Sequence, residues 1–313
     1  MPPSITSLET LLERLATGER PGAVQLTVLS DLGRAEGAVL RARWPSLPVE
    51  MRRSVLERSL ELAEDNVDLD FSGLVRVAIS DEDADVRRMA VLAGWENRST
   101  ALARLYAQML RSDPDEGVRA AVAEALAGFV LDRELGRFDT EAGDLLVSQL
   151  KEVWEAREES VDVRARALES LGPRSLPWVD IAITDAYYEA DSRIRLAAVR
   201  AMGASANERW LEFLEETATS EDPEMRFQTA NAIGLIGSEA GIEQLKDLLA
   251  DEDDEVVIAA ISALGAIGGE EAVEVLQRID ADEEGPVADA IEEAIEDAKY
   301  HEDKDLLASR IGL

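Results

Sequence analysis

Residues 220–268 read SEDPEMRFQTANAIGLIGSEAGIEQLKDLLADEDDEVVIAAISALGAIG. The stretch contains one pattern twice: an acidic turn, an apolar residue, a helical segment rich in small residues, and a glycine. The apolar residues, which we call anchors, are Met225 and Val256, and they lie 31 residues apart. Self-similarity at a period of roughly 20 to 50 residues indicates a repeat architecture.

The anchor recurs along most of the chain. Small residues follow it at plus four and plus seven in most copies, which is the apolar stripe of an amphipathic helix, and glycine often follows at plus nine. A second segment with Leu and Val at helical spacing lies between successive anchors. The anchors are Val86, Val118, Val163, Ile194, Met225, Val256 and Val287, with Met51 as a weaker candidate, and the last five are spaced by 31 residues.

These observations predict an all-α fold. Alternation with a period of two residues is nowhere long enough for a strand, so each repeat is expected to contain two helices. One hairpin cannot cover its own apolar face, and neighbouring hairpins must therefore stack. We predict a right-handed α-solenoid of stacked antiparallel helix hairpins.

Three segments differ in regularity. Residues 1–69 are interrupted by prolines and predict an irregular helical N-terminal cap. Residues 70–298 form the predicted repeat array, and residues 299–313 a charged C-terminal tail, which either frays or docks back onto the stack. Near residues 129–140 the array is longer than its period, which predicts an insertion. It forms either a functional loop or an elongated helix.

Charge limits the class of partner. The chain has 66 acidic and 32 basic residues and a net charge of −34. Nucleic acids and anionic membrane surfaces both select for clustered Lys and Arg, so neither is an expected partner. The charge permits a basic protein partner, although solubility or salt adaptation is the more common explanation of an acidic surface. No apolar run is long enough to span a membrane and no signal peptide is recognised, so a cytoplasmic location is expected.

No catalytic or metal site is expected. The chain has no Cys, which excludes thiolate catalysis and Cys-ligated metals. Its one His, His301, lies in the predicted tail, so neither a Ser-His-Asp triad nor a His-rich metal centre is expected. We therefore predict no cofactor and no enzyme activity.

An aspartate and an arginine recur around the anchor in fixed order. In four copies the Asp lies four residues before the Arg, and it can cap the helix by accepting free backbone N–H groups. The Arg can reach the Asp of its own or the next repeat. We predict a structural Asp/Arg ladder, with anion binding as the alternative. Its residues are Asp83, Arg87, Asp115, Arg119, Arg164, Asp191, Arg195, Asp222 and Arg226.

The repeat also predicts an exposed face on the concave side. Positions plus two, plus three and plus six from the anchor should point outward, and plus two is apolar in three successive repeats. An apolar column with polar neighbours is typical of a peptide- or helix-binding groove, whereas burial between repeats is the alternative. The predicted partner-binding residues are Leu196, Arg200, Phe227, Gln228, Asn231, Ile258 and Ser262.

The repeat unit resembles the short HEAT-like repeats of the phycobilisome-lyase type. The resemblance covers roughly residues 70–298 and is strongest in residues 220–268. It implies a non-catalytic protein-binding scaffold or assembly factor that holds a segment of a partner protein on its concave face. The alternative is a subunit of a phycobilin-lyase-like complex that handles a chromophore.

Overall fold

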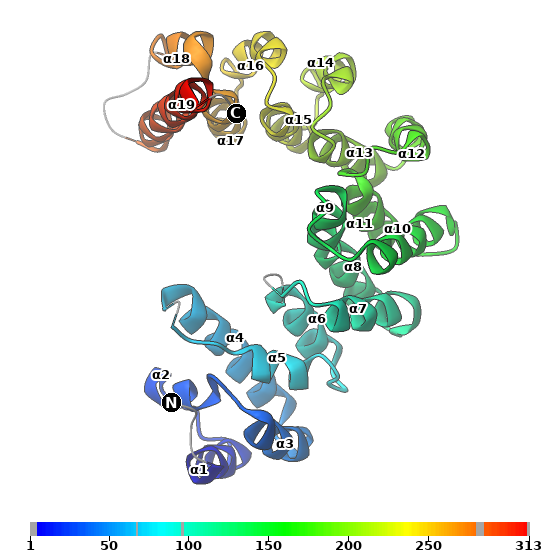
Figure 1. Cartoon of the computed structure of the whole chain (residues 1–313), viewed down its shortest axis with the longest axis vertical. Helices are drawn as coiled ribbons and strands as arrows, with labels where there is room; N and C mark the ends of the chain where they lie inside the picture. Colours follow the sequence, from blue (N-terminus) through cyan, green and yellow to red (C-terminus); the bar gives the residue numbers. More distant parts are fainter. Residues whose placement is uncertain (1–4, 67, 95–96, 280–284, 312–313) are drawn as a thin grey trace. The chain divides into compact units, whose positions relative to one another are not determined.

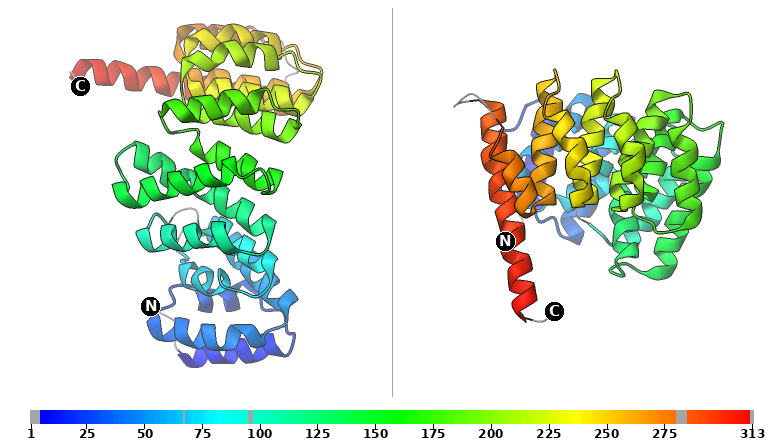
Figure 2. Two further views of the ribbon diagram at one scale, coloured as in Figure 1. Left: turned by 90° about the vertical axis from the view of Figure 1, so that its right-hand side faces the viewer. Right: turned by 90° about the horizontal axis from the view of Figure 1, so that it is seen from above.

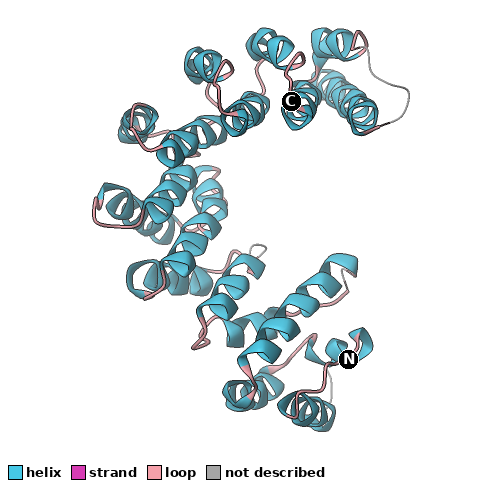
Figure 3. Cartoon of the chain, turned by 180° about the vertical axis from the view of Figure 1, so that it is seen from behind, coloured by secondary structure: helices cyan, strands magenta, loops and turns pink. Residues whose placement is uncertain are grey.

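The computed structural model describes the backbone of residues 5–66, 68–94, 97–279 and 285–311, with side chains described as far as residue 299. The described residues form helices joined by turns, with no strand among them (Figure 3). The predicted all-α fold, an α-solenoid of stacked hairpins, is confirmed. Two compact units are present: unit 1, Met1–Arg166, and unit 2, Ala167–Leu313.

In unit 1, the anchor-bearing helices α4, α6 and α8 pack side by side, with α5 against α6 and α7 against α8 (Figure 1). The 3-10 turns η1 (Thr27–Leu29) and η2 (Trp44–Ser46) separate the first helices. The helices are α1 (Ile5–Ala16), α2 (Ala23–Leu26), α3 (Arg34–Arg43), α4 (Val49–Asp65), α5 (Ser72–Ala78), α6 (Ala84–Ala93), α7 (Thr100–Ser112), α8 (Glu116–Ala125), α9 (Ala127–Glu134) and α10 (Thr140–Glu155), and α11 (Val161–Leu171) contains the boundary with unit 2.

Unit 2 consists of two rows of helices (Figures 1 and 2). The anchor row contains α13, α15, α17 and α19, packed side by side, and the second row contains α12, α14, α16 and α18, each packed on a helix of the anchor row. The bounds are α12 (Pro177–Tyr187), α13 (Ser192–Ala204), η3 (Glu208–Trp210), α14 (Leu211–Thr217), α15 (Pro223–Ile236), η4 (Glu239–Gly241), α16 (Ile242–Leu248), α17 (Asp254–Ile267), α18 (Gly269–Leu276) and α19 (Pro286–Ile311).

Helices of the anchor row touch through glycine and alanine. A Cβ atom added to Gly203 would lie 2.7 Å from Cα of Ala232 in the next repeat. These residues occupy plus nine of one repeat and plus seven of the next, so the two small positions of the pattern meet across the repeat boundary. The same contact joins Gly172 to Ala201, Gly234 to Ala263, and Gly265 to Ala294.

The anchor helices begin at side-chain caps. The Asp83 carboxylate accepts a hydrogen bond from the backbone N–H of Val86, and Asp115 accepts one from Val118. Each carboxylate satisfies a backbone donor that the first helical turn leaves free. Asp191, Asp222 and Asp253 cap α13, α15 and α17 in the same way.

The structure differs in detail from the predicted segment boundaries. Helix α4 lies within residues 1–69 yet packs against α6 as a member of the anchor-bearing row. At the other end, α19 runs without interruption across residue 299 to Ile311. The predicted insertion spans the end of α9, a turn and the start of α10, and Phe129 within it is buried. Its ring packs edge-on against Phe138, so part of the insertion joins the core.

We predict that Gly203→Ala lowers the stability of the protein by about 1–3 kcal/mol, because the new methyl group would meet the backbone of α15. The matched control is Gly37→Ala in α3, where an added Cβ meets no atom within 4 Å. That change should leave stability unchanged or raise it by up to about 1 kcal/mol, through helix propensity alone. Thermal and urea unfolding followed by circular dichroism measure both effects. Equal effects of the two substitutions would contradict the close contact.

Candidate functional site: the anchor-row face and the turn ladder

The predicted apolar column lies at equivalent positions of α13, α15 and α17. Leu196, Phe227 and Ile258 are all half-buried. Each side chain therefore packs partly within the row and keeps a part that remains accessible. The column matches neither full exposure nor full burial between repeats.

The polar members of the predicted face are joined in a network around Glu224. Arg200 donates one hydrogen bond to Glu169 at 3.1 Å and another to Glu224 at 3.2 Å. Gln228 donates to the same Glu224 oxygen at 3.1 Å. The two carboxylates compensate the charge of Arg200, and the network holds its guanidinium beside the column. Asn231 is half-buried and Ser262 exposed on the same face.

The face includes a residue that the repeat analysis did not select. Leu235 lies one helical turn after Asn231 on α15, and 64% of its surface is exposed. A single exposed apolar side chain is common on protein surfaces. Leu235 is of interest because it lies on the same helix as Phe227, a member of the half-buried column. Its spacing of four residues from Asn231 was a signal available in the sequence. The predicted face includes positions up to plus six from the anchor, whereas Leu235 is at plus ten.

Helix α19 adds negative charge at one end of this face. Asp289, Glu293 and Asp297 occupy plus two, plus six and plus ten of the last repeat, and all three are exposed. None of them forms a hydrogen bond or an ion pair through its side chain with another residue of the described part of the chain. Among the residues whose side chains are described, the apolar column therefore ends beside carboxylates without a side-chain partner.

The predicted ladder arginines mostly bridge two successive turns. Arg226 donates to both carboxylate oxygens of Asp251 at 2.6 and 2.8 Å, and to the carbonyl of Ser220 in its own turn at 2.8 Å. Arg87 binds Asp113 and the carbonyl of Asp81 in the same arrangement. Arg119 binds Glu159 and the carbonyl of Asp113. Each guanidinium thus joins its own turn to the next one.

The ladder differs from the prediction in its acidic partner. The carboxylate that binds Arg226 belongs to Asp251, two residues before the cap Asp253, whose own carboxylate accepts the helix N–H of Glu255. Asp251 also accepts the N–H of Asp253, which orders the turn. Among the described anchor helices the ladder ends at α17, where Val257 stands at the arginine position.

Two predicted ladder arginines have other surroundings. Arg164 donates from Nε to the carbonyl of Trp154 and lies 5.0 Å from the centre of its ring. The side chain of Arg195 makes no hydrogen bond or ion pair within the described part of the chain. The physical reason at Arg195 is that Ser220 stands two residues before the next cap, where the ladder requires an acid.

A buried version of the ladder lies in unit 1. Arg52, which follows the weak anchor Met51, donates to Asp81 at 2.8 Å, and their side chains are only 4% and 0% exposed. The Trp44 indole N–H also donates to Asp81. A buried pair of this kind is costly to break from one side, because the remaining charge loses its partner. The pairing therefore extends into residues 1–69.

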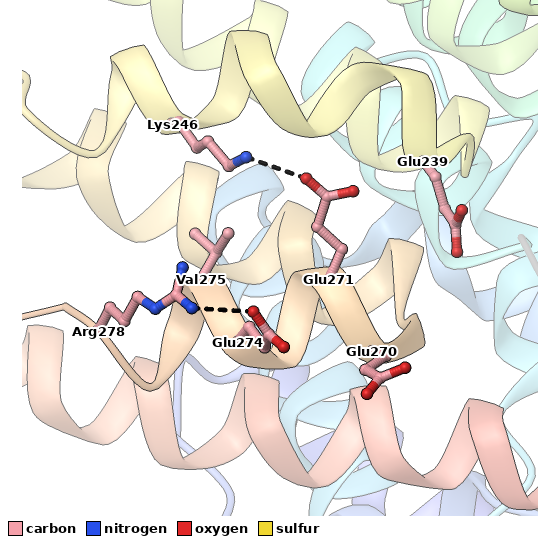
Figure 4. A pocket seen from close by; sticks show the side chains of 7 residues that line it. All are labelled: Glu239, Lys246, Glu270, Glu271, Glu274, Val275 and Arg278. Atoms are coloured by element: carbon pink, nitrogen blue, oxygen red, sulfur yellow. Dashed lines mark hydrogen bonds and ion pairs between the residues drawn. The ribbon is translucent and has the colours of Figure 1, made fainter.

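A polar cleft lies between α16 and α18 in the second row (Figure 4). Its volume is about 540 Å³, and Glu239, Glu270, Glu271, Glu274, Lys246, Val275 and Arg278 line it. Lys246 donates to Glu271 at 3.0 Å and Arg278 to Glu274 at 2.9 Å, so both cations are paired. No group of His, Asp and Glu side chains in the described residues is arranged to hold a metal ion.

Part of the chain is similar to HEAT repeats. The model of HEAT repeats matches residues 181–261 and 212–296, the region in which the Gly–Ala contacts and the anchor row are most regular. Among the described helices, none combines the length and apolar character needed to cross a bilayer. No curated protein gives a significant match.

Several solved structures are similar to the chain. A designed armadillo repeat protein is 17% identical over 62% of this chain and 98% of its own, with a TM-score of 0.39. Human deoxyhypusine hydroxylase is 17% identical over 85% and 96%, with a TM-score of 0.37. Importin beta is 16% identical over 93% of this chain and 46% of its own, with a TM-score of 0.47.

The ladder predicts a pH dependence of stability. Hydrogen bonding to Arg226 lowers the pKa of Asp251 below its usual value, although burial opposes the shift. A lowered pKa means that the stabilisation is complete above the pKa of the unfolded chain, about 4, and is lost as pH falls through the folded value. Asp251→Asn should therefore lower stability by about 1–2 kcal/mol at pH 7, and the difference from wild type should vanish in acid.

Urea unfolding at pH 7, 5 and 3 measures this difference. Asp247→Asn is the control, because Asp247 is exposed and its side chain has no partner among the described residues. A deficit for Asp251→Asn that persists unchanged at pH 3 would show that the ion pair is not its cause.

Proposed function

We propose that the protein is a non-catalytic protein-binding scaffold or assembly factor, in which the anchor-row face of unit 2 holds a segment of a partner protein. The observation that carries this proposal is the half-buried apolar column of Leu196, Phe227 and Ile258, together with Leu235, which is 64% exposed and lies about two helical turns after Phe227 on α15. Stacked helical repeats typically present extended surfaces of this kind to partners.

The chemistry of the face favours a partner segment that is apolar and basic. Apolar side chains of the segment would cover Leu235 and the open part of Phe227. Arginine or lysine side chains would meet Asp289 and Glu293 on α19, which are exposed. Arg200, the cation of the face, is already bound by two glutamates and does not repel such a segment. Association should therefore be faster at low salt.

Other predicted functions receive less support. Nucleic acid would require clustered cations, and the arginines of the ladder and of the face are largely engaged by carboxylates. The chromophore-handling alternative gains no supporting arrangement among the described residues, and we do not propose it. A cytoplasmic location and the absence of enzyme activity stay predictions.

Leu235→Glu should abolish partner binding and leave the fold intact, because the side chain is mostly in solvent. Its control is Ile181→Glu on α12 of the second row, where the side chain is 62% exposed and the chemical change is the same. Partners recovered by affinity purification and mass spectrometry from the source cells would be tested as purified proteins by calorimetry. Affinity should fall at least roughly tenfold for Leu235→Glu, since burying such a side chain is worth about 1.5–3 kcal/mol.

Circular dichroism verifies that both variants remain helical. Equal affinity of Leu235→Glu and wild type for every purified partner would falsify the assignment of the face. Stronger loss from Ile181→Glu than from Leu235→Glu would move the binding surface to the second row. Increasing salt should weaken the complex if the partner segment is basic.

A further inference from the structure

The ladder lacks its ion pair at two steps: at α11, where Arg164 instead donates to the carbonyl of Trp154, and at α13. Arg52, Arg87, Arg119 and Arg226 each bind a carboxylate of the following turn. Arg195 occupies the same position after its anchor Ile194, yet the following turn offers Ser220. Within the described residues its guanidinium has no hydrogen bond and no ion pair.

The turn at Ser220 is otherwise built like the others. The Ser220 hydroxyl accepts the N–H of the cap Asp222 at 3.2 Å, as the Asp251 carboxylate accepts that of Asp253 at 3.0 Å. The Ser220 carbonyl accepts a hydrogen bond from Arg226 at 2.8 Å. Serine therefore preserves the turn geometry, and the missing feature is the carboxylate that would bind Arg195.

A cavity of about 330 Å³ opens at this step. Tyr188 stands beside it with 72% of its surface exposed, held edge-on by the ring of Tyr187 at 5.1 Å. An aromatic side chain in this position offers an apolar wall next to the guanidinium. The lining residues are Tyr187, Tyr188, Glu189, Arg195, Glu216, Thr217, Ser220, Asp222 and Met225.

Arg195 is the one cation among the lining residues, and three carboxylates line the cavity with it: Glu189, Glu216 and Asp222. Glu216 accepts a hydrogen bond from the Tyr187 hydroxyl at 2.8 Å, and Asp222 caps α15 by accepting the N–H of Glu224. Among the described residues, none of the three carboxylates forms an ion pair with Arg195. Neighbouring acidic residues do not prevent an arginine of the ladder from binding a carboxylate. Arg226 binds Asp251 although the acidic cap Asp253 lies two residues away.

The geometry points to a binding site for a carboxylate of a partner protein, either an acidic side chain or the end of a chain. The carboxylate takes the place beside Arg195 that an aspartate holds in the complete steps. Two parallel N–H···O bonds are the preferred arrangement for a guanidinium and a carboxylate. The Tyr188 ring packs on the apolar atoms next to it. The site is separate from the anchor-row face, and it would bind a carboxylate even if that face bound nothing.

Short peptides test this site in the full chain. The probes are acetyl-Gly-Ala-Glu-Ala-amide, its neutral Gln analogue, and the Gln analogue with a free C-terminus, each titrated at constant ionic strength, with inorganic phosphate as a separate titrant. The readout is the Arg195 side-chain N–H signal in ¹⁵N spectra, assigned with Arg195→Gln. Either carboxylate peptide should shift the signal, and the comparison of the two distinguishes a side-chain carboxylate from a chain end. The neutral peptide should not shift it.

Ser220→Asp is the decisive variant, because it supplies the missing carboxylate from the chain itself. It should shift the Arg195 signal without ligand and reduce peptide affinity at least roughly tenfold, the loss expected for a charge-assisted hydrogen-bonded pair. Asn207→Asp adds the same charge at an exposed helix cap and should bind like wild type.

Three results would overturn the site: equal shifts from the charged and neutral peptides, a response to phosphate alone, or unchanged peptide binding by Ser220→Asp. A lack of any shift in wild type at millimolar peptide would overturn it as well. The two proposals can fail independently. Leu235→Glu should lose partner binding but keep peptide binding, and Ser220→Asp should lose peptide binding but keep partner binding at the face.

Discussion

The contact between a glycine of one anchor helix and an alanine of the next is the constraint on which the structure of unit 2 depends. It allows backbones to approach to a distance that no larger pair of side chains permits, as Gly203 and Ala232 show. Because the contact recurs at each step from Gly172 to Ala294, it keeps the anchor row in register. The ladder and the open face both follow from this register, since each needs equivalent residues of successive repeats at a constant separation.

The arginines add a directional link to this contact. The Gly–Ala contact sets the distance between two helices. Arg226 also joins the turn of α15 to the turn of α17, through two hydrogen bonds to Asp251 and one to the carbonyl of Ser220 in its own turn. The ladder is therefore structural at the steps where an acid is present. Arg195 forms no such ion pair among the described residues, because Ser220 preserves the geometry of the turn without supplying a negative charge. One substitution in a repeat thus converts a stabilising element into a candidate binding group.

Much of the fold was accessible from the sequence because the repeat encodes it in short-range patterns. The anchors, the small positions and the capping aspartates depend on spacing along one helix, and the helices, caps and close contacts appear at those positions. The partner of each arginine was less accessible, because the choice between Asp251 and Asp253 depends on the conformation of the turn, which residue spacing does not specify. Leu235 is absent from the predicted face because that face covers only the first two turns after the anchor Met225, whereas α15 continues to Ile236. In residues 1–69 the repeat pattern is weak, because Met51 and Arg52 closely follow Pro48 and no glycine stands at plus nine.

The end of the ladder at Val257 has a consequence for how unit 2 responds to its solvent. Upstream, the junction from α15 to α17 combines a dispersion contact with an ion pair, so salt and acid both weaken it. At the junction from α17 to α19 the described structure offers the Gly265–Ala294 contact and apolar packing, with no arginine bridge. Hydrogen exchange in α19 should therefore be insensitive to ionic strength, whereas exchange in α15 should accelerate with salt.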